Sequence, residues 1–222
     1  MNLALFDLDG TLLPRDSDHA FGAYLIALGW ADAGEFKRRN DAFYADYLAG
    51  RLDMQAYVEF ATSAWRERPE AELAEVQRRF VDEVVRPMLT APALALVRQH
   101  LEAGDRVAMV TATNEFVTRP ICALFGIDTL IATDLARDEE GRVTGAIAGT
   151  PAFREGKIAR VQAWLASEGL ALEHFERSVF YSDSTNDLPL LERVSHPVAT
   201  NPGEGLARIA RERGWPVLHL FP

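Results

Sequence analysis

Hydrophobic residues in this chain gather in short, unbroken runs that each end in a polar or acidic residue. These runs are NLALFD near the start and then RVAMVTAT, TLIATD, SVFYSD and HPVAT, with a further apolar run at WPVLHL. Continuous rather than alternating hydrophobicity indicates strands that are buried on both faces. Between the runs, apolar residues recur every three or four positions and predict helices over residues 91–103, 115–125, 154–168, 187–193 and 203–213. This alternation predicts an α/β fold with a doubly wound parallel sheet.

Two segments depart from the alternation. The stretch LARDEEGRVTGAIAG, residues 135–149, predicts a hairpin that turns at Glu140 and Gly141. Residues 15–89 contain no convincing strand, and their spacing of apolar residues predicts an all-helical insertion. The insertion leaves from the carboxyl end of the first strand, where open α/β sheets bind ligands. We therefore expect a core domain of residues 1–14 and 90–222, with residues 15–89 forming a cap over its site.

Polar residues suited to catalysis follow the predicted strands, and a lysine begins the helix before the fourth: Asp7, Asp9, Thr111, Asp183, Asp187 and Lys157. A doubly wound sheet brings its strand ends to one edge, so these residues should meet there. Three carboxylates around one cleft favour a hard divalent cation, above all Mg²⁺. A hydroxyl and a lysine beside them favour an anionic ligand, for which phosphate is the natural candidate.

The set formed by DLDGT, a threonine after the second strand, a lone lysine and SDSTND resembles the four motifs of the haloacid dehalogenase superfamily of phosphohydrolases. A helical cap between the first two motifs makes the chain similar to the phosphoserine phosphatase-like branch. The resemblance covers essentially the whole chain. It implies a Rossmann-like core, an aspartyl-phosphate intermediate and dependence on Mg²⁺.

The resemblance also implies roles for the residues of the first motif. Asp7 would be the nucleophile and a metal ligand, with Lys157 screening its charge and that of the phosphate. Asp9 would lend its backbone carbonyl to the metal, and its side chain would move the proton. Gly10 would allow the sharp exit from the strand.

Roles for the later motifs follow from the same resemblance. Thr111 and Lys157 would bind the phosphate, as would Asn186. Asp183 would complete the metal site, with Asp187 in support.

Other polar and aromatic residues receive a structural interpretation. Asp16, Ser17 and Asp18 precede a helix and are interpreted as capping residues. The five histidines have no metal-ligand spacing and are assigned to the core or the surface. The aromatic residues of the cap are interpreted mostly as packing residues, with one of them facing the substrate at most: Phe43, Tyr44, Tyr47, Tyr57 and Phe60.

Composition restricts the class of partner. The chain of 222 residues has 33 acidic and 23 basic residues, and a net charge of -10 disfavours nucleic acid and anionic membranes as partners. Its single cysteine, Cys122, excludes an internal disulfide framework, and no segment has the length of a membrane span. We expect a cytoplasmic protein, and the sequence leaves the oligomeric state open.

The predicted function is Mg²⁺-dependent hydrolysis of a small phosphomonoester metabolite. Phosphoserine, histidinol phosphate and a lipid phosphate all remain candidate substrates, although the acidic charge weighs against the lipid. Asp9 disfavours dehalogenation, which needs no acid at that position. Phosphotransfer to a second alcohol stays open, as does a non-catalytic module that binds a phosphorylated metabolite.

Glu59 supplies a prediction of substrate specificity. The stretch LAGRLDMQAYVEF resembles the part of the phosphoserine phosphatase cap in which an arginine holds the substrate carboxylate. With Gly50 and Leu52 as anchors, Glu59 takes the place of that arginine, although Arg51 or Arg66 are alternatives. A carboxylate there would repel phosphoserine and favour an amine-bearing substrate without a carboxylate, such as histidinol phosphate.

Overall fold

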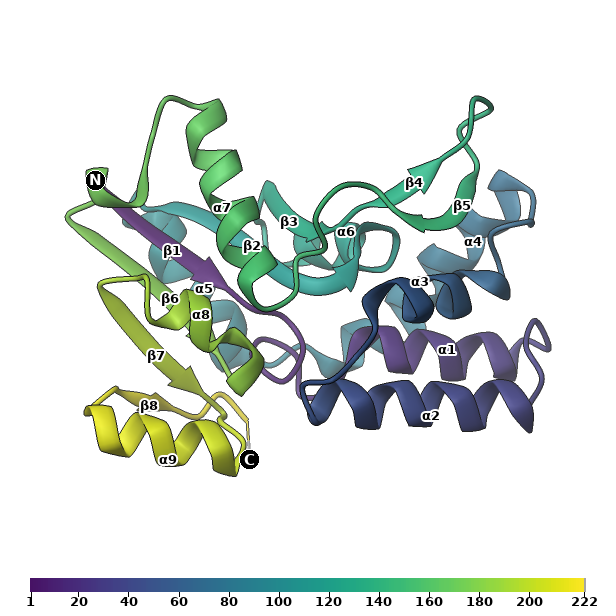
Figure 1. The fold of residues 1–222 in the computed structure, drawn as a ribbon, viewed down its shortest axis with the longest axis horizontal. Helices are drawn as coiled ribbons and strands as arrows, with labels where there is room; N and C mark the ends of the chain where they lie inside the picture. The colour runs from purple at the N-terminus through teal and green to yellow at the C-terminus, as the bar shows by residue number, and fades with distance from the viewer. Residues whose placement is uncertain (222) are drawn as a thin grey trace.

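A computed structural model describes residues 1–221 and consists of a parallel sheet at one end and a group of helices at the other (Figure 1). The sheet has six strands in the order β3-β2-β1-β6-β7-β8, and all of its ladders are parallel. The strands are β1 (Asn2–Phe6), β2 (Arg106–Asn114), β3 (Thr129–Thr133), β6 (Arg177–Ser182), β7 (His196–Thr200) and β8 (Val217–Leu218). The strand order reverses between β1 and β6, so the ends of these two strands form the crevice in which such sheets bind ligands. The predicted doubly wound parallel sheet is confirmed.

Helices cover both faces of the sheet. They are α5 (Ala91–Glu102), α6 (Glu115–Leu124), α7 (Glu155–Ser167), α8 (Leu188–Leu191) and α9 (Glu204–Arg213). Successive residues of β1 point to opposite faces: Phe6 packs with Val97 of α5, whereas Leu5 packs in the cluster that contains Val161 of α7. Two buried faces explain why the strands have unbroken rather than alternating hydrophobicity.

A run of helices separates β1 from α5, and we call residues 16–88 the cap. Its elements are α1 (Ser17–Ala27), α2 (Glu35–Leu48), α3 (Met54–Ser63), α4 (Glu70–Phe80), a π-helical turn (Val81–Val85) and a 3-10 turn (Arg86–Met88). The carboxyl end of β1 points toward these helices in Figure 1. The domain boundaries expected at residues 14 and 89 lie just outside this run and remain a prediction.

Side-chain caps set the starts of several helices. The carboxylates of Asp16 and Asp53 accept hydrogen bonds from the backbone of the first turns of α1 and α3, and Asn114 does the same for α6. The last part of the predicted helical insertion runs from α4 through the π-helical turn into the 3-10 turn that contains Pro87, whose ring nitrogen has no hydrogen to donate to a preceding carbonyl.

The predicted hairpin of residues 135–149 is present as β4 (Leu135–Arg137) and β5 (Val143–Ile147). It reaches from the core to the cap, where Gln55 of α3 donates to the carbonyl of Gly145 and accepts from the N–H of Ile147, each over 3.2 Å. Two predicted elements are shorter than expected. Residues 187–193 contain a 3-10 turn and the single turn α8, and the last strand has two residues.

Residues 1–221 include no helix that combines the length and the apolar character needed to cross a bilayer.

Candidate active site

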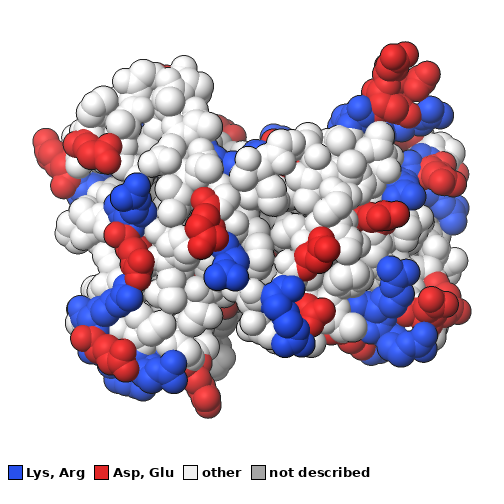
Figure 2. Space-filling model, viewed as in Figure 1, with Lys and Arg blue, Asp and Glu red and all other residues white. Residues whose placement is uncertain are grey.

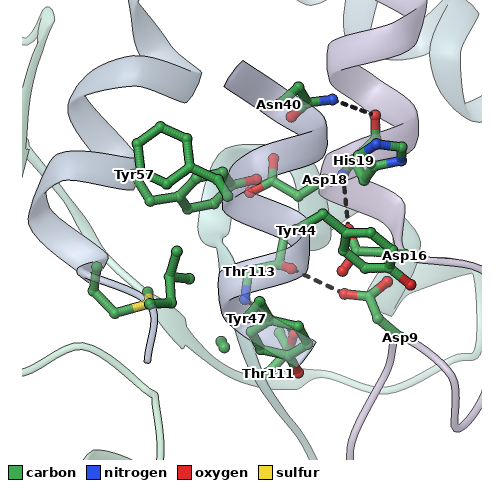
Figure 3. Close-up of a pocket in the computed structure, with 14 residues that line it drawn as sticks. Asp9, Asp16, Asp18, His19, Asn40, Tyr44, Tyr47, Tyr57, Thr111 and Thr113 are labelled. Atoms are coloured by element: carbon green, nitrogen blue, oxygen red, sulfur yellow. Dashed lines mark hydrogen bonds between the residues drawn. The ribbon is translucent and has the colours of Figure 1, made fainter. Parts of the chain in front are cut away.

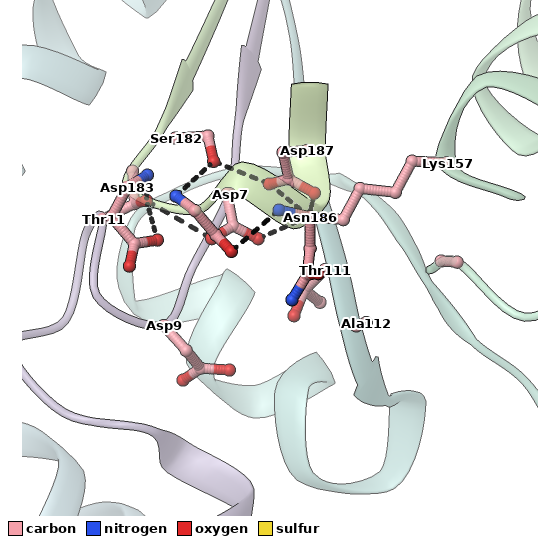
Figure 4. Close-up of polar contacts among 12 residues, drawn as sticks. Asp7, Asp9, Thr11, Thr111, Ala112, Lys157, Ser182, Asp183, Asn186 and Asp187 are labelled. Carbon is pink, nitrogen blue, oxygen red and sulfur yellow. Dashed lines mark hydrogen bonds and ion pairs between the residues drawn. The ribbon is translucent and has the colours of Figure 1, made fainter. Parts of the chain in front are cut away.

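Lys157 of α7 connects the ends of β1 and β6 through two buried ion pairs (Figure 4). Its Nζ lies 2.7 Å from Oδ1 of Asp7 and 2.8 Å from the carboxylate of Asp187. Ser182, the last residue of β6, donates to Asp187 over 2.7 Å and fixes that carboxylate. Side chains from three distant parts of the sequence are therefore held in one buried network.

Burial and charge oppose each other in this network. Burial raises the pKa of Asp7 to about 7, with Asp187 adding to the rise and Lys157 opposing it. Burial alone would lower the pKa of Lys157, but the carboxylates of Asp187 and Asp7 outweigh that effect and raise it. Lys157 consequently stays positively charged at neutral pH and supplies a fixed cation next to Asp7.

Asp183 lies on the other side of Asp7, with Thr11 between them. Oγ1 of Thr11 is 3.3 Å from Oδ2 of Asp7 and 3.1 Å from Oδ1 of Asp183, and it accepts the N–H of Asp183 over 3.0 Å. Gly10 has a φ of +77°, and a Cβ on it would lie 2.3 Å from Oδ2 of Asp183. Only a glycine at this position leaves room for the carboxylate.

The oxygen atoms around Thr11 suit a hard divalent cation. Burial raises the pKa of Asp183 well above its usual range, and the neighbouring charges of Asp7 and Asp187 raise it further. A cation between Asp7 and Asp183 would remove that repulsion, and oxygen donors are the ligands that Mg²⁺ prefers. Among residues 1–221, no three side chains of His, Cys, Asp or Glu are grouped to hold a metal unaided. The expected set uses only two carboxylates together with the backbone carbonyl of Asp9, so this residue set fits the ion.

The side chain of Asp9 stands apart from the Lys157 network (Figure 4). It accepts hydrogen bonds from the N–H of Ser17 over 2.7 Å and from the hydroxyl of Thr113 over 2.9 Å. Burial raises the pKa of Asp9 to about 7, and the nearby charge of Asp16 adds to the rise. A carboxyl group with this pKa can both give and take a proton near neutral pH.

The remaining two expected site residues lie at different places on this edge. Thr111 is buried at the end of β2 and faces the cavity described next. Asn186 does not point into that cavity: its side-chain amide donates to the carbonyl of Tyr47 in α2 over 2.9 Å. The structure therefore gives Asn186 a contact with the cap that the sequence pattern did not indicate.

A small cavity separates this edge of the sheet from the cap (Figure 3), and we call it the acidic cavity. Its volume is about 30 Å³, which leaves room for a water molecule or two. Its lining residues are Asp9, Asp16, Asp18, His19, Asn40, Phe43, Tyr44, Tyr47, Leu52, Met54, Tyr57, Thr111, Ala112 and Thr113. Core and cap therefore both contribute to its walls.

Carboxylates dominate the polar lining of the acidic cavity. Burial raises the pKa of Asp16 and of Asp18 to about 7 in each case. Asp18 accepts hydrogen bonds from Tyr57 and Asn114. No lysine or arginine of residues 1–221 lines the cavity, and His19 is already paired with Asp41 over 2.9 Å. The acidic cavity therefore attracts positive charge.

The interpretation of Asp16, Ser17 and Asp18 as capping residues is right only for Asp16. Asp18 faces the acidic cavity instead, and it is buried. The repeated Asp-x-Asp spacing at the start of the cap is the sequence signal that points to it, because a helix needs only one capping carboxylate.

The structure does not place Glu59 at the acidic cavity, so its contact with the substrate stays a prediction. Its side chain is exposed and absent from the lining of the acidic cavity. Met54 and Tyr57 are the residues of α3 that line the cavity, and a position two residues beyond Tyr57 lies about 200° around the helix. The alternatives do not line the cavity either, since Arg51 pairs with Asp46 on the surface and Arg66 lies in a different cleft.

The cap aromatics contribute more to the cavity than expected. Phe43, Tyr44, Tyr47 and Tyr57 all line it, and Phe60 alone of the five is excluded. The ring of Tyr44 stacks on that of His19 at 4.8 Å between centroids. The acidic cavity therefore combines buried carboxylates with aromatic faces.

Comparison with known proteins identifies the family. The sequence model of haloacid dehalogenase-like hydrolases matches residues 4–192. The chain belongs to the haloacid dehalogenase-like hydrolase family. A histidinol-phosphatase of Neisseria meningitidis serogroup C is 46% identical over 99% of both chains. The predicted relationship to the phosphohydrolases of this superfamily is confirmed.

Solved structures agree with this assignment. A Bordetella pertussis Tohama I protein described as having unknown function superposes with a TM-score of 0.93, at 51% identity and 99% coverage of both chains. A substrate-bound phosphoserine phosphatase superposes with a TM-score of 0.67, covering 97% of this chain and 91% of that one. Its identity of 18% establishes a shared fold and nothing finer.

Proposed function

We propose that this chain is a Mg²⁺-dependent phosphatase that hydrolyses a small phosphomonoester bearing an amine and no carboxylate, with histidinol phosphate as the best candidate. Asp7, Asp183 and the backbone carbonyl of Asp9 would hold the cation. When bound, the ion would draw charge from the phosphate oxygens. Nucleophilic attack, proton transfer and phosphate binding would be carried out by side chains of the protein.

The chemical steps are assigned to two aspartates. A carboxylate oxygen of Asp7 attacks phosphorus, and the bond from phosphorus to the ester oxygen breaks as the new bond forms. Asp9 donates its proton to the departing alkoxide, so the alcohol leaves neutral. Asp9 then takes a proton from water, whose oxygen attacks the phosphorus and returns Asp7 to a free carboxylate. Inorganic phosphate is the second product.

Lys157 and Thr111 would bind the phosphate during both steps. The fixed charge of Lys157, 2.7 Å from Asp7, reduces the repulsion between the nucleophile and an anionic ester. Thr111 is buried beside the acidic cavity and has a hydroxyl free to donate to a phosphate oxygen. Asp187 keeps Lys157 in place.

The observation that carries the choice of substrate is the charge of the acidic cavity. Asp16 and Asp18 line the same cavity as Asp9 and Thr111, and no guanidinium or ammonium lines the cavity among the described residues. A substrate ammonium would gain two charge-assisted hydrogen bonds there. A substrate carboxylate would face repulsion without a partner, as phosphoserine would.

The aromatic lining favours a substrate with a flat ring. Tyr44, Tyr47 and Tyr57 offer faces on which an imidazole or a cation can lie. Histidinol phosphate has an amine, an imidazole ring and a phosphate, and it has no carboxylate. The name of the N. meningitidis relative, 46% identical along its length, supports the same choice.

Substrate access would require movement of the cap. A volume of about 30 Å³ is far below the roughly 300 Å³ of ordinary ligand pockets. The cap supplies Tyr44, Tyr47 and Tyr57, so displacing it would open the acidic cavity to solvent. We propose that this motion hinges near Pro14 and Leu89 and accompanies each turnover.

The deciding experiment compares kcat/KM in Mg²⁺ for histidinol phosphate, phosphoethanolamine, phosphoserine and an aryl phosphate without an amine. We expect histidinol phosphate to exceed phosphoserine by at least about 100-fold, since juxtaposed like charges cost several kcal/mol and each ~1.4 kcal/mol is tenfold. The matched variant Asp18→Asn should narrow that ratio while preserving hydrolysis of the aryl phosphate. A preference of the unmodified protein for phosphoserine would overturn the substrate assignment, and absence of hydrolysis of all four esters would overturn the activity.

A further inference from the structure

A second and much larger cleft lies on the other side of α6, between the cap and the β4–β5 hairpin. Its volume is about 740 Å³, within the range of small-molecule sites. Its walls come from the turn after α3 and from α4 in the cap, and from α6 and the hairpin in the core. We call it the arginine cleft, after Arg66, Arg68, Arg119, Arg137 and Arg142, which line it.

The charge of the arginine cleft is opposite to that of the whole protein. Five arginines line it against three glutamates, in a chain whose net charge is -10. In Figure 2 the end of the molecule that carries the hairpin has basic side chains set beside acidic ones. The acidic cavity has carboxylates and no arginine, so the two hollows would bind ligands of opposite charge.

Two of these guanidinium groups have no carboxylate partner among residues 1–221. Arg68, Arg137 and Arg142 form ion pairs with acidic neighbours. Arg66 donates only to the backbone carbonyl of Glu59, over 3.3 Å, and Arg119 makes no hydrogen bond or ion pair with the described residues. Arg66 and Arg119 therefore keep free donors for an anion from outside the chain.

The position of Arg66 is fixed by the hairpin. Gly145 of β5 has a φ of +89°, and a Cβ on it would lie 2.2 Å from Nη1 of Arg66. The absence of a side chain at Gly145 thus makes room for the guanidinium against the backbone of β5. An arginine that is already held in place loses less conformational entropy when it binds an anion.

The floor of the cleft is apolar and aromatic. Phe116 of α6 lines it together with Leu73, Pro120 and Val143. The ring of Phe116 is supported from below by Trp65, which stacks on it at 4.3 Å between centroids with 19° between the ring planes. A flat apolar group would find a rigid surface here, next to the arginines.

From these features we propose that the arginine cleft is a second, non-catalytic site that binds a phosphorylated organic anion with a flat apolar body, of the nucleotide class. Its phosphate groups pair with Arg66 and Arg119, whose planar donors match phosphate oxygens. Its ring lies over Phe116. The proposal does not depend on the identity of the substrate at the catalytic edge.

An occupant of this cleft would touch both moving parts of the protein. Arg66 belongs to the cap and Arg119 to the core, so one anion would link them. The first turn of α6 also connects the two hollows, because Asn114 donates to Asp18 in the acidic cavity and Phe116 lines the arginine cleft two residues later. Bound ligand would therefore favour the arrangement in which the cap is closed.

Isothermal titration calorimetry with adenosine α,β-methylene diphosphate tests the proposal, because the methylene bridge replaces the oxygen between the two phosphorus atoms and the terminal phosphoryl group cannot be hydrolysed off. We expect one site per chain in the unmodified protein. The double variant Arg66→Gln/Arg119→Gln should weaken binding by about 10- to 100-fold, since charged hydrogen bonds contribute roughly 1.5–3 kcal/mol. The affinity of the variant Arg66→Lys/Arg119→Lys should lie between those of the unmodified protein and the glutamine variant, because lysine keeps the charge and loses the planar fork.

The matched control is Arg208→Gln, which removes an exposed arginine of α9 and should leave the affinity unchanged. Melting temperatures of all variants identify any that misfold. Absence of binding by the unmodified protein at millimolar ligand would overturn the proposal. Binding of equal strength in the double glutamine variant would also overturn it, because the ligand would then occupy another place, such as the catalytic edge.

Discussion

The side-chain amide of Asn186, in the turn after β6, donates a hydrogen bond over 2.9 Å to the backbone carbonyl of Tyr47 at the end of α2. This bond joins the catalytic edge of the sheet to the cap. A second tether runs beside it, from the guanidinium of Arg154 to the carbonyl of Gly50 over 3.0 Å. The loop between α2 and α3 is thus held to the core by two side chains.

The variant Asn186→Ala should loosen this part of the cap. Loss of one hydrogen bond of about 1 kcal/mol shifts the closed-to-open equilibrium about fivefold. Hydrogen exchange of residues 47–53 in the absence of substrate should accelerate accordingly, and Arg154→Ala should act in the same direction. Unchanged exchange in both variants would show that these contacts do not restrain the cap.

Chelation should abolish hydrolysis and also lower stability. Without a cation, the buried carboxylates of Asp7 and Asp183 repel each other, as the rise in the pKa of Asp183 indicates. We therefore expect EDTA to eliminate activity and Mg²⁺ to restore it, with a melting temperature that increases with Mg²⁺ concentration. Full activity in excess chelator would contradict the assignment of the metal ligands.

Substitution of Asp7 and substitution of Asp9 should impair different steps of the reaction. Asp7→Asn removes the nucleophile, so no phosphorylated protein should accumulate after acid quenching of a labelled substrate. Asp9→Asn should slow the reaction by about 10²–10⁴-fold through loss of proton transfer. Phosphorylated protein in the Asp7→Asn sample would place the nucleophile elsewhere.

The strand-end residues could be predicted because the parallel sheet leaves little choice. A carboxylate that directly follows a buried strand lies at the ligand-binding edge wherever its partners occur in the sequence, which is how Asp7 and Lys157 meet across 150 positions. No such constraint from the sheet fixes the surroundings of Asp18. A carboxylate at a helix start is equally satisfied by capping, whereas Asp18 accepts hydrogen bonds from Tyr57 and from Asn114, 96 residues away, at the cavity.

Glu59 does not line the acidic cavity, for a different reason. Its expected place came from an ungapped match to another cap, and a shift of two residues along a helix turns a side chain by about 200°, to the opposite face. Met54 and Tyr57 mark the face of α3 that meets the cavity.

Substrate binding should depend on pH through Asp18. Burial raises its pKa to about 7, so Asp18 is neutral below that pH and negative above it. The KM of an amine-bearing phosphate should therefore fall as the pH rises through about 7, and Asp18→Asn should remove this part of the dependence. An aryl phosphate without an amine provides the comparison, because its KM should not change with the ionisation of Asp18 near pH 7.

The carboxyl group of Asp18 should also make folding stability depend on pH, with stability decreasing as the pH rises. The native pKa of about 7 exceeds the ordinary value of 3.8, so the native state keeps a proton that the unfolded chain releases between these values. The free energy of unfolding must then decrease as the pH rises from about 4 to 7. Asp18→Asn should raise stability at pH 8, by at most ~4 kcal/mol for a shift of about three units. Equal melting temperatures at pH 8 would refute this account.

Gly10 has a consequence for how this family can diverge. Its φ of +77° and the carboxylate of Asp183, 2.3 Å from any added Cβ, each exclude another residue at this position. We therefore expect glycine at this position in relatives that keep the carboxylate of Asp183, whatever ester they hydrolyse. No such double restriction applies to the cap residues Asp16, Asp18 and Tyr57. We therefore expect new substrate specificities to arise by substitutions in the cap, while the residue in the turn after β1 stays glycine.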